Sequence, residues 1–360
     1  MSDNKISANQ LKYSIACYLL GSILLSSFAF PITLKETWIV IISGYLVSLI
    51  FICIYIAIAK RFPGKNIIQI NDAVFGKVIG KIISIFYILY FFALTVLNTR
   101  DLGNFTTGYV LPGTPITASL IPFIFICAWA VNNDIFNFVK YAFSLTVLFG
   151  IIILTNSLLL IENYDIRNML PTFSLPFVKY VHGTHLVSMI PFTEVFVFTM
   201  IFPFMDKDGK FNKAVISGVS LGAIAMLFLT VRDTLVLGPL VDNMSMPSFE
   251  VVRLINIANI LTRLEITFAV ALLFLQFYRI TIMYYCTVLA FTEFFKLKSY
   301  KTLILPLGII IISSSLLTFP SIMENVYFAH NAAIMAWAFI TAFLPLATYI
   351  IVLIRNMKEQ

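Results

Sequence analysis

Two ionisable residues within long apolar stretches are the strongest candidates for chemistry in this sequence. Glu194 is the only acidic residue within the apolar runs that we expect to span a membrane, and it follows Pro191 by three residues. Proline removes a backbone donor and disrupts a helix, and a carboxylate inside a membrane is costly and usually faces a cavity. We therefore expect Glu194 to belong to a functional site. The alternative is a carboxylate that only caps backbone amides freed at a broken helix.

Arg279 is the second candidate, because it is the only basic residue inside an expected span. It could pair with an acid, extend to the inner membrane face or line a cavity. The end of its apolar segment lies about 13 residues away, so we favour an interior position. His182 and His185 stand three residues apart, but two ligands are too few for a metal and no others are evident nearby. We expect no metal site there.

Motifs of known catalytic or nucleotide sites are incomplete in this chain. Gly76 and Gly80 enclose three residues, and no Ser or Thr follows Lys81, so this is not a phosphate-binding loop. The patterns HExxH and GxGxxG after a strand are missing, and the four cysteines stand singly in different apolar segments. Gly218-Val219-Ser220-Leu221-Gly222 has the small-xxx-small spacing that is more typical of helix packing than of chemistry. We therefore expect neither an enzyme nor a cofactor.

The elements that position these residues follow from composition. Hydrophobic residues make up 60% of the chain and charged residues 11%, so lipid must be the solvent of much of the surface. Tyr13–Leu34, for example, is uncharged over 22 residues, enough to cross the hydrocarbon core as a helix. The alternation typical of a β-barrel is missing. We expect an all-α polytopic membrane protein whose ten spans form one domain, at residues 13–34, 38–59, 82–99, 113–133, 141–161, 183–205, 214–231, 266–292, 302–320 and 331–354.

The distribution of lysine and arginine predicts the orientation of these spans. With the N-terminus inside, the inner loops hold sixteen basic residues and the outer loops seven, Arg100 and Arg232 among them. Basic residues are retained on the cytoplasmic side, so we expect both termini in the cytoplasm. The pI near 9.1 then reflects topology, and we expect no nucleic-acid partner. Of the longer outer loops, residues 162–182 should be irregular and residues 247–264 helical, with an extension of the following span as the alternative.

A second interrupted helix is expected in the first span, at Gly21 and Ser22. Glycine tolerates strained backbone angles, and serine can satisfy backbone groups freed by unwinding. Interrupted helices at corresponding positions of two halves indicate the binding site of a transporter. Spans one and six would then open two inverted five-helix repeats, residues 11–161 and 183–354, as in LeuT-like transporters. On its own, a glycine such as Gly21 is more often a packing residue.

Several segments, in this order and spacing, resemble the B subunits of spore germinant receptors, a branch of the amino acid–polyamine–organocation superfamily. The similar segments are Leu20-Gly21-Ser22-Ile23-Leu24-Leu25, Lys60-Arg61-Phe62-Pro63-Gly64-Lys65, Pro191-Phe192-Thr193-Glu194-Val195 with Ile201-Phe202-Pro203, and Gly238, Pro247 and Thr262-Arg263-Leu264-Glu265. The chain departs from the family in having Ile23 in place of a second glycine, Leu273 and Phe274 in place of a tryptophan, and Asn98 in place of an acid.

The resemblance implies a subunit that binds a small germinant, such as an amino acid, in the inner membrane of the spore. Its partners would be an A subunit and a lipoprotein C subunit, besides membrane lipid. The ligand would lie at the unwound parts of helices 1 and 6, with a lining that includes Gly21, Ser22, Pro191, Thr193, Glu194 and Tyr284; Thr281 is added from its position one turn away. An amino-acid or cation transporter of the same fold is the second interpretation, and a membrane enzyme or scaffold the third.

Overall fold

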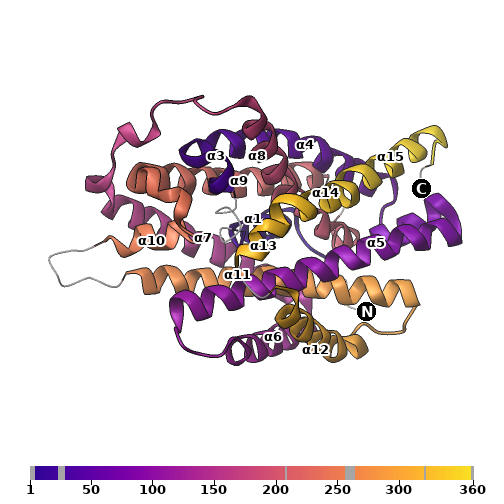
Figure 1. Ribbon diagram of the computed structural model, residues 1–360. Helices are drawn as coiled ribbons and strands as arrows, with labels where there is room; N and C mark the ends of the chain where they lie inside the picture. Colours follow the sequence, from indigo (N-terminus) through magenta and orange to yellow (C-terminus); the bar gives the residue numbers. More distant parts are fainter. Residues whose placement is uncertain (1–4, 23–28, 207–208, 256–263, 320–321, 358–360) are drawn as a thin grey trace.

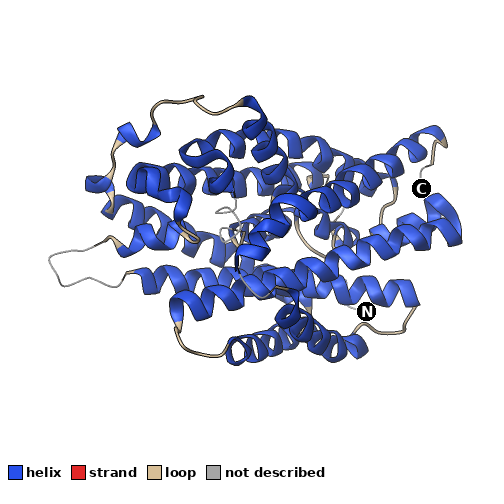
Figure 2. Cartoon of the chain, in the orientation of Figure 1, coloured by secondary structure: helices blue, strands red, loops and turns tan. Residues whose placement is uncertain are grey.

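The computed structural model describes all residues except 1–4, 23–28, 207–208, 256–263, 320–321 and 358–360. The described residues form helices and connecting turns, with one isolated bridge between Ile6 and Met205 (Figures 1 and 2). The α-helices are α1 (Ala8–Leu20), α3 (Phe30–Thr33), α4 (Thr37–Arg61), α5 (Ile67–Phe105), α6 (Ile116–Asn132), α7 (Ile135–Leu159), α8 (Phe177–Met189), α9 (Phe211–Leu237), α10 (Pro247–Arg253), α11 (Glu265–Phe295), α12 (Lys301–Thr318), α13 (Ile322–Phe328), α14 (Ile334–Trp337) and α15 (Leu344–Ile354).

Short 3-10 and π segments join or extend these helices. They are η2 (Leu34–Glu36), η3 (Thr106–Val110), η4 (Ile161–Asn163), η5 (Ile166–Met169), η6 (Phe192–Met200), η7 (Phe202–Phe204), η8 (Gly238–Asn243), η9 (Ala329–Ala333) and η10 (Ala338–Phe343). The most consequential is η6, because it continues the chain directly beyond the end of α8 and carries Glu194.

Seven helical segments in the described part of the chain are long and apolar enough to cross a membrane. Three of the ten expected spans, the first, fourth and sixth, fall short of that length. The first and sixth are interrupted, so that α1 and α8 have 13 residues each, and α6 has 17. The protein is thus an all-helical membrane protein, whereas the count of ten spans and their division into two repeats stay predictions.

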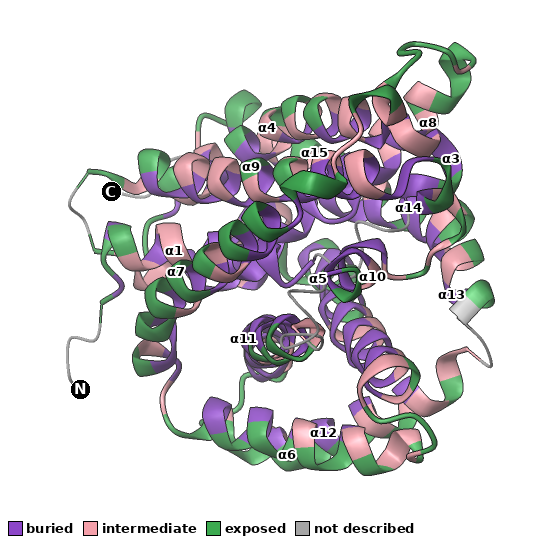
Figure 3. Cartoon of the chain, turned by 90° about the vertical axis from the view of Figure 1, so that its left-hand side faces the viewer, coloured by how far each residue is buried: buried purple, intermediate pink, exposed green. Residues whose placement is uncertain are grey.

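The outer surface of the bundle is apolar. Leu46, Ile50, Phe125 and Leu154 each expose more than half of their surface, and exposed residues line the periphery in Figure 3. α11 lies in the interior, where every residue from 278 to 290 is buried. A helix that is buried on all sides can carry a charge only if the surrounding helices supply its partner, so Arg279 is held by the core.

Four charged residues correct the expected spans. We assigned Arg100 and Arg232 to outer loops and described Glu194 as the only acid in a span, but Arg100 and Asp101 lie within α5, and Arg232 and Asp233 within α9, all buried. An expected span that is defined as an uncharged run ends at the first charged residue. In α9 that charge is neutralised locally: Arg232 Nη2 lies 2.7 Å from Asp233 Oδ1.

The two longer loops that we expect on the outer side agree with the prediction only in part, because α8 already occupies residues 177–182 and α10 ends at Arg253. The loop after α7 has only the short η4 and η5 before α8 begins at Phe177. Pro247 occupies the first turn of α10, as expected for a helix there. The expected continuation with Asn256, Asn259 and Arg263 on one face lies outside the described residues.

Glu36 fastens the loop before α8 to the beginning of α4. Its carboxylate accepts hydrogen bonds from the backbone amides of Phe173 (2.7 Å) and Ser174 (3.0 Å), and from the hydroxyls of Ser174 and Tyr180. A carboxylate with four donors is well satisfied although it is buried. The loop and the start of α4 therefore form one connected unit, which we call the Glu36 clasp.

Candidate functional site

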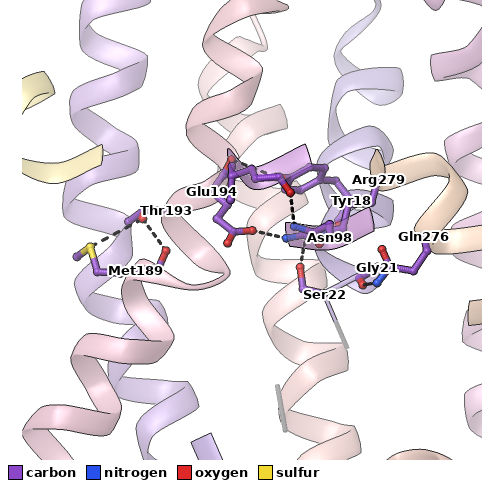
Figure 4. A network of polar contacts seen from close by, with 10 residues as sticks. Tyr18, Gly21, Ser22, Asn98, Met189, Thr193, Glu194, Gln276 and Arg279 are labelled. Atoms are coloured by element: carbon purple, nitrogen blue, oxygen red, sulfur yellow. Dashed lines mark hydrogen bonds and ion pairs between the residues drawn. The ribbon is translucent and has the colours of Figure 1, made fainter. Parts of the chain in front are cut away.

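Two helix interruptions meet near the centre of the bundle. α1 ends at Leu20 and the chain turns at Gly21 and Ser22. α8 ends at Met189, and beyond Pro191 the chain continues as η6. The two regions are neighbours, because the Tyr18 hydroxyl lies 3.5 Å from the backbone oxygen of Glu194. Figure 4 shows this region; residues Ile23, Leu24 and Leu25 of the expected helix 1 break lie outside the described part.

Arg279 of α11 joins the two interruptions. Its guanidinium donates to a side chain of α5, to two groups around the end of α1 and to the carboxylate on η6 (Figure 4). The acceptors are Asn98 Oδ1 (2.8 Å), the Tyr18 backbone oxygen (2.9 Å), Ser22 Oγ and Glu194 Oε2. Arginine has five N–H groups in a fixed planar fork, so one side chain holds four segments in register.

The structure decides between the roles left open for Arg279: it pairs with an acid in the interior. Neither Arg279 nor Glu194 exposes more than 2% of its side chain. Burying two charges is costly unless they are paired and their remaining donors are satisfied. The ring of Tyr18 adds a further favourable contact, with its centroid 4.3 Å from the guanidinium carbon.

Gly21 is a point of close approach between α1 and α11. Gln276 Nε2 donates to the Gly21 backbone oxygen over 2.9 Å. A Cβ atom at Gly21 would lie 3.0 Å from Arg279 Cβ and 3.1 Å from the Leu275 backbone oxygen. A larger side chain would therefore push α11 and the guanidinium away from the interruption.

Thr193 secures the second interruption from the other side. Its hydroxyl donates to the Met189 backbone oxygen (3.1 Å) and lies 2.9 Å from the Thr341 hydroxyl of η10. The threonine hydroxyl satisfies the Met189 carbonyl at the end of α8. Thr193 thereby links the broken helix to the last spanning segment.

The other two predicted lining residues take different positions. Thr281 is buried on α11, and no hydrogen bond to the Arg279 network is present among the described contacts. The Tyr284 hydroxyl donates to the Ile304 backbone oxygen of α12 and faces Gly308. The structure thus gathers Gly21, Ser22, Thr193 and Glu194 around the two breaks, but turns Tyr284 toward α12. Whether any of these residues touches a ligand stays a prediction.

Three partners of this network were not selected from the sequence. Tyr18 and Gln276 each stand three residues before a selected residue, Gly21 and Arg279. Polar residues one turn away in otherwise apolar helices were the available signal. Asn98 had been noted only as a departure from the family pattern, and it proves to accept from Arg279 Nε.

The histidines do not gather into a larger cluster in the described part of the chain. His182 Nε2 lies 3.2 Å from the backbone oxygen of His330, and no group of three His, Cys, Asp or Glu residues that could hold a metal occurs among the described residues. What the site offers is an ion pair, hydroxyls and interrupted backbone. These groups suit recognition of a small polar molecule.

The fold defines the class of protein as an all-helical membrane protein with interrupted helices. It is similar to the structure of Mhp1, a nucleobase-cation-symport-1 family transporter in a closed conformation with bromovinylhydantoin bound. The TM-score is 0.66 at 14% sequence identity, over 98% of this chain and 79% of that chain. At that identity the likeness concerns the fold alone.

The chain belongs to the spore germination protein family, whose model matches residues 5–322. It is 26% identical to spore germination protein KB of Bacillus subtilis, over 88% of this chain and 87% of that protein. Spore germination protein YndE of the same organism is 24% identical, with 82% of each chain covered. Spore germination protein B2 is 24% identical, over 66% of this chain and 64% of that protein, so there the match spans less than two thirds of the relative.

Proposed function

We propose that this protein is the germinant-binding membrane subunit of a spore germination receptor, and that an amino acid binds where the two helix interruptions meet. The observation that supports this most directly is the Arg279–Glu194 pair, which lies between the end of α1 and η6. Family membership supports the role in germination, and the transporter-like fold supports a central binding site. The proposed lining includes Gly21, Ser22 and Thr193.

The chemistry of the interruptions suits an amino acid. Free backbone amides at helix N-termini carry positive partial charge and attract a carboxylate. The guanidinium of Arg279 can receive the same group in a bidentate manner, and Glu194 is a complementary partner for an ammonium. In the structure the two side chains satisfy each other, so an entering ligand would take over part of that pairing.

We further propose that the subunit works in the inner spore membrane with an A subunit and a lipoprotein C subunit, surrounded by lipid and without a nucleic-acid partner. Both termini would face the cytoplasm. The long runs of apolar helix surface support the membrane location, and the sixteen inner basic residues support the orientation.

Germination of spores that lack the gene tests the proposed role. Wild-type and deletion spores would be exposed to twenty amino acids, several sugars and inorganic salts, and loss of refractility would be recorded. We expect at least one amino acid to lose its effect in the deletion spores and to recover it on complementation. Normal germination with every compound would contradict the proposal, and co-purification with A and C subunits would test the assembly.

An amino-acid or cation transporter is the second candidate, because the fold resembles that of Mhp1. Uptake into liposomes that contain the purified chain separates the two functions. A binding subunit should bind an amino acid without accumulating it, with or without an ion gradient. Gradient-driven accumulation would favour the transporter.

Cysteine labelling tests the orientation. In a cysteine-free background, single cysteines at the exposed Glu162 and Asn243 should react with an impermeant thiol reagent added outside. Cysteines at Pro63 and Ser299, which are also exposed, should react only after the membrane is opened. These four positions are accessible in the structure, whereas Asn66 is buried and would label poorly on either side. The reverse labelling pattern would refute the cytoplasmic termini.

A further inference from the structure

A small cavity lies beside the ion pair. Its volume is about 30 Å³, and it is bounded by α5, the beginning of η6 and the α13–α14 region. The polar lining residues are Asn98, Asp101, Glu194 and Asn325, and the other walls are apolar, with Trp337 among them. A cavity of this size holds one water molecule or a single small polar group. The cavity is thus suited to one functional group of a ligand.

Asp101 brings a carboxylate to this cavity without a cation of its own. The residue is 7% exposed, and Oδ1 accepts a hydrogen bond from Asn325 Nδ2 over 2.5 Å. None of the described residues donates to Oδ2. The neighbouring Arg100 is directed elsewhere, since its Nη1 lies 3.4 Å from the backbone oxygens of Ser315 and Leu316.

Negative groups therefore outnumber positive groups around the cavity. Arg279 gives its four hydrogen bonds to Tyr18, Ser22, Asn98 and Glu194, none of them to Asp101. Glu194 uses Oε2 for this pair, and its other carboxylate oxygen accepts nothing from the described residues. Two carboxylates thus share one guanidinium. A buried carboxylate without a counter-charge must either take up a proton or meet a further positive group. A cationic group of a ligand would supply the second.

We propose that Asp101, with Glu194 and Asn325, forms a subsite for a single monovalent cationic group, and we assign that group to the ammonium of an amino acid. The inference rests on the proposed function and narrows it: amino acids fit, whereas sugars and simple carboxylic acids lack the required charge. Carboxylate oxygens and an amide oxygen are the acceptors that an ammonium with three donors needs. Asp101 is then a specificity-determining residue, separate from the interruptions that would receive the ligand carboxylate.

Binding to the purified full-length chain in nanodiscs tests this subsite. The compounds are the twenty amino acids, the hydroxy acids lactate, glycolate and 2-hydroxyisovalerate, ethylammonium chloride, KCl, NaCl and glucose, each measured by thermal shift and calorimetry. We expect an amino acid to bind at least tenfold more tightly than its hydroxy-acid counterpart. Asp101→Asn should weaken the amino acid at least tenfold and leave the hydroxy acid unchanged.

Two further variants show whether a loss of binding is specific. Asp101→Glu keeps the charge and should recover part of the amino-acid affinity. Asp233→Asn removes a carboxylate that is equally buried but has its own arginine partner. It should lower thermal stability, while the ratio of amino-acid to hydroxy-acid affinity stays the same. If Asp101→Asn fails to fold, Asp101→Glu still tests the proposal through that ratio, which a longer carboxylate should change.

Any other outcome would contradict the proposed subsite, and each alternative explanation predicts a different result. Equal weakening of amino and hydroxy acids by Asp101→Asn would mean that the carboxyl only positions α5 or holds a proton. Stabilisation by KCl or NaCl alone, lost in Asp101→Asn, would replace the ammonium by an alkali ion. Amino-acid binding unaffected by the change would leave the proposed function standing without the subsite. Binding of glucose alone would overturn the subsite and the proposal that the ligand is an amino acid. Binding of no compound would refute the proposed function itself.

Discussion

Two buried ion pairs of this protein differ in the part of the fold that they hold together. Arg232 and Asp233 are adjacent on α9, and the Ser248 hydroxyl of α10 donates to the same carboxylate. Arg279 and Glu194 stand 85 residues apart and meet only where α1, α5, η6 and α11 come together. The first pair forms within one helix and fixes a neighbouring short helix. The second exists only in the assembled core, so any movement of the broken helices must change it.

This difference separates two kinds of buried ion pair: one that stabilises a single helix, and one that depends on how several segments are arranged. A pair of sequence neighbours can be satisfied almost anywhere in a fold, because one helix supplies both groups. A pair formed between distant segments reports on their relative position. If ligand binding moves the interruptions, the Arg279–Glu194 pair is the part of the network that must respond.

Loss of either arginine should produce the largest effect. Arg279→Ala and Arg232→Ala each leave a buried carboxylate without its partner, which costs about 3–5 kcal/mol of stability. We expect both variants to melt at clearly lower temperature in nanodiscs. At equal protein level in spores, only Arg279→Ala should abolish the germinant response. A full response in Arg279→Ala, or its loss in Arg232→Ala at normal abundance, would contradict the proposed difference between the two ion pairs.

Gly21→Leu should come next. The leucine would displace Arg279 and α11 from the end of α1, so the response should be lost while the protein still accumulates in the membrane. Gly21→Ala should have an intermediate effect, because its Cβ would already stand 3.0 Å from Arg279 Cβ. Gly150→Leu is the matched control, since nothing lies within 4 Å of a Cβ there. A normal dose response in Gly21→Leu would reduce Gly21 to a packing residue.

Glu194→Gln should have the smallest effect. The amide keeps an oxygen that can accept from Arg279, so a receptor that does not cycle protons should retain a substantial germinant response. Glu194→Ala should fail, because it leaves the buried guanidinium without its counter-charge and Nη2 of Arg279 without its acceptor. The two variants would be compared by germination rate at matched protein level. Equal loss in both would indicate a carboxyl that must gain and lose a proton, which favours active transport.

The sequence predicted the fold class and the positions of the interruptions well, because both depend on local chemistry. Apolar runs define helices in lipid, and Gly21 and Pro191 mark where a helix can end. The partner of Arg279 was harder to predict from the sequence. Pairing with an acid was one of three open roles, and its choice requires knowing that α11 passes between α1 and η6.

The buried charges of α5 and α9 were missed for a physical reason. A count of charged residues cannot distinguish a solvated loop from a helix whose charges are buried against partners in the fold. Arg232 has Asp233 as its partner, and Arg100 faces backbone oxygens of α12. Arg100-Asp101 and Arg232-Asp233 are both adjacent residues of opposite charge, and that pattern was the available signal. Removing Arg100 and Arg232 from the outer loops leaves five basic residues there, which strengthens the predicted orientation.

The Glu36 clasp has a practical consequence for the face of the protein that we expect to lie outside. A surface loop normally loses conformational entropy when a binder orders it. In the loop before α8, four hydrogen bonds to Glu36 already hold residues 173–180 against the beginning of α4. Phe173 and Phe177 are exposed on this fixed frame, at 71% and 78%. The segment is therefore a preorganised epitope, well suited to an antibody fragment that would hold the protein for cryo-electron microscopy.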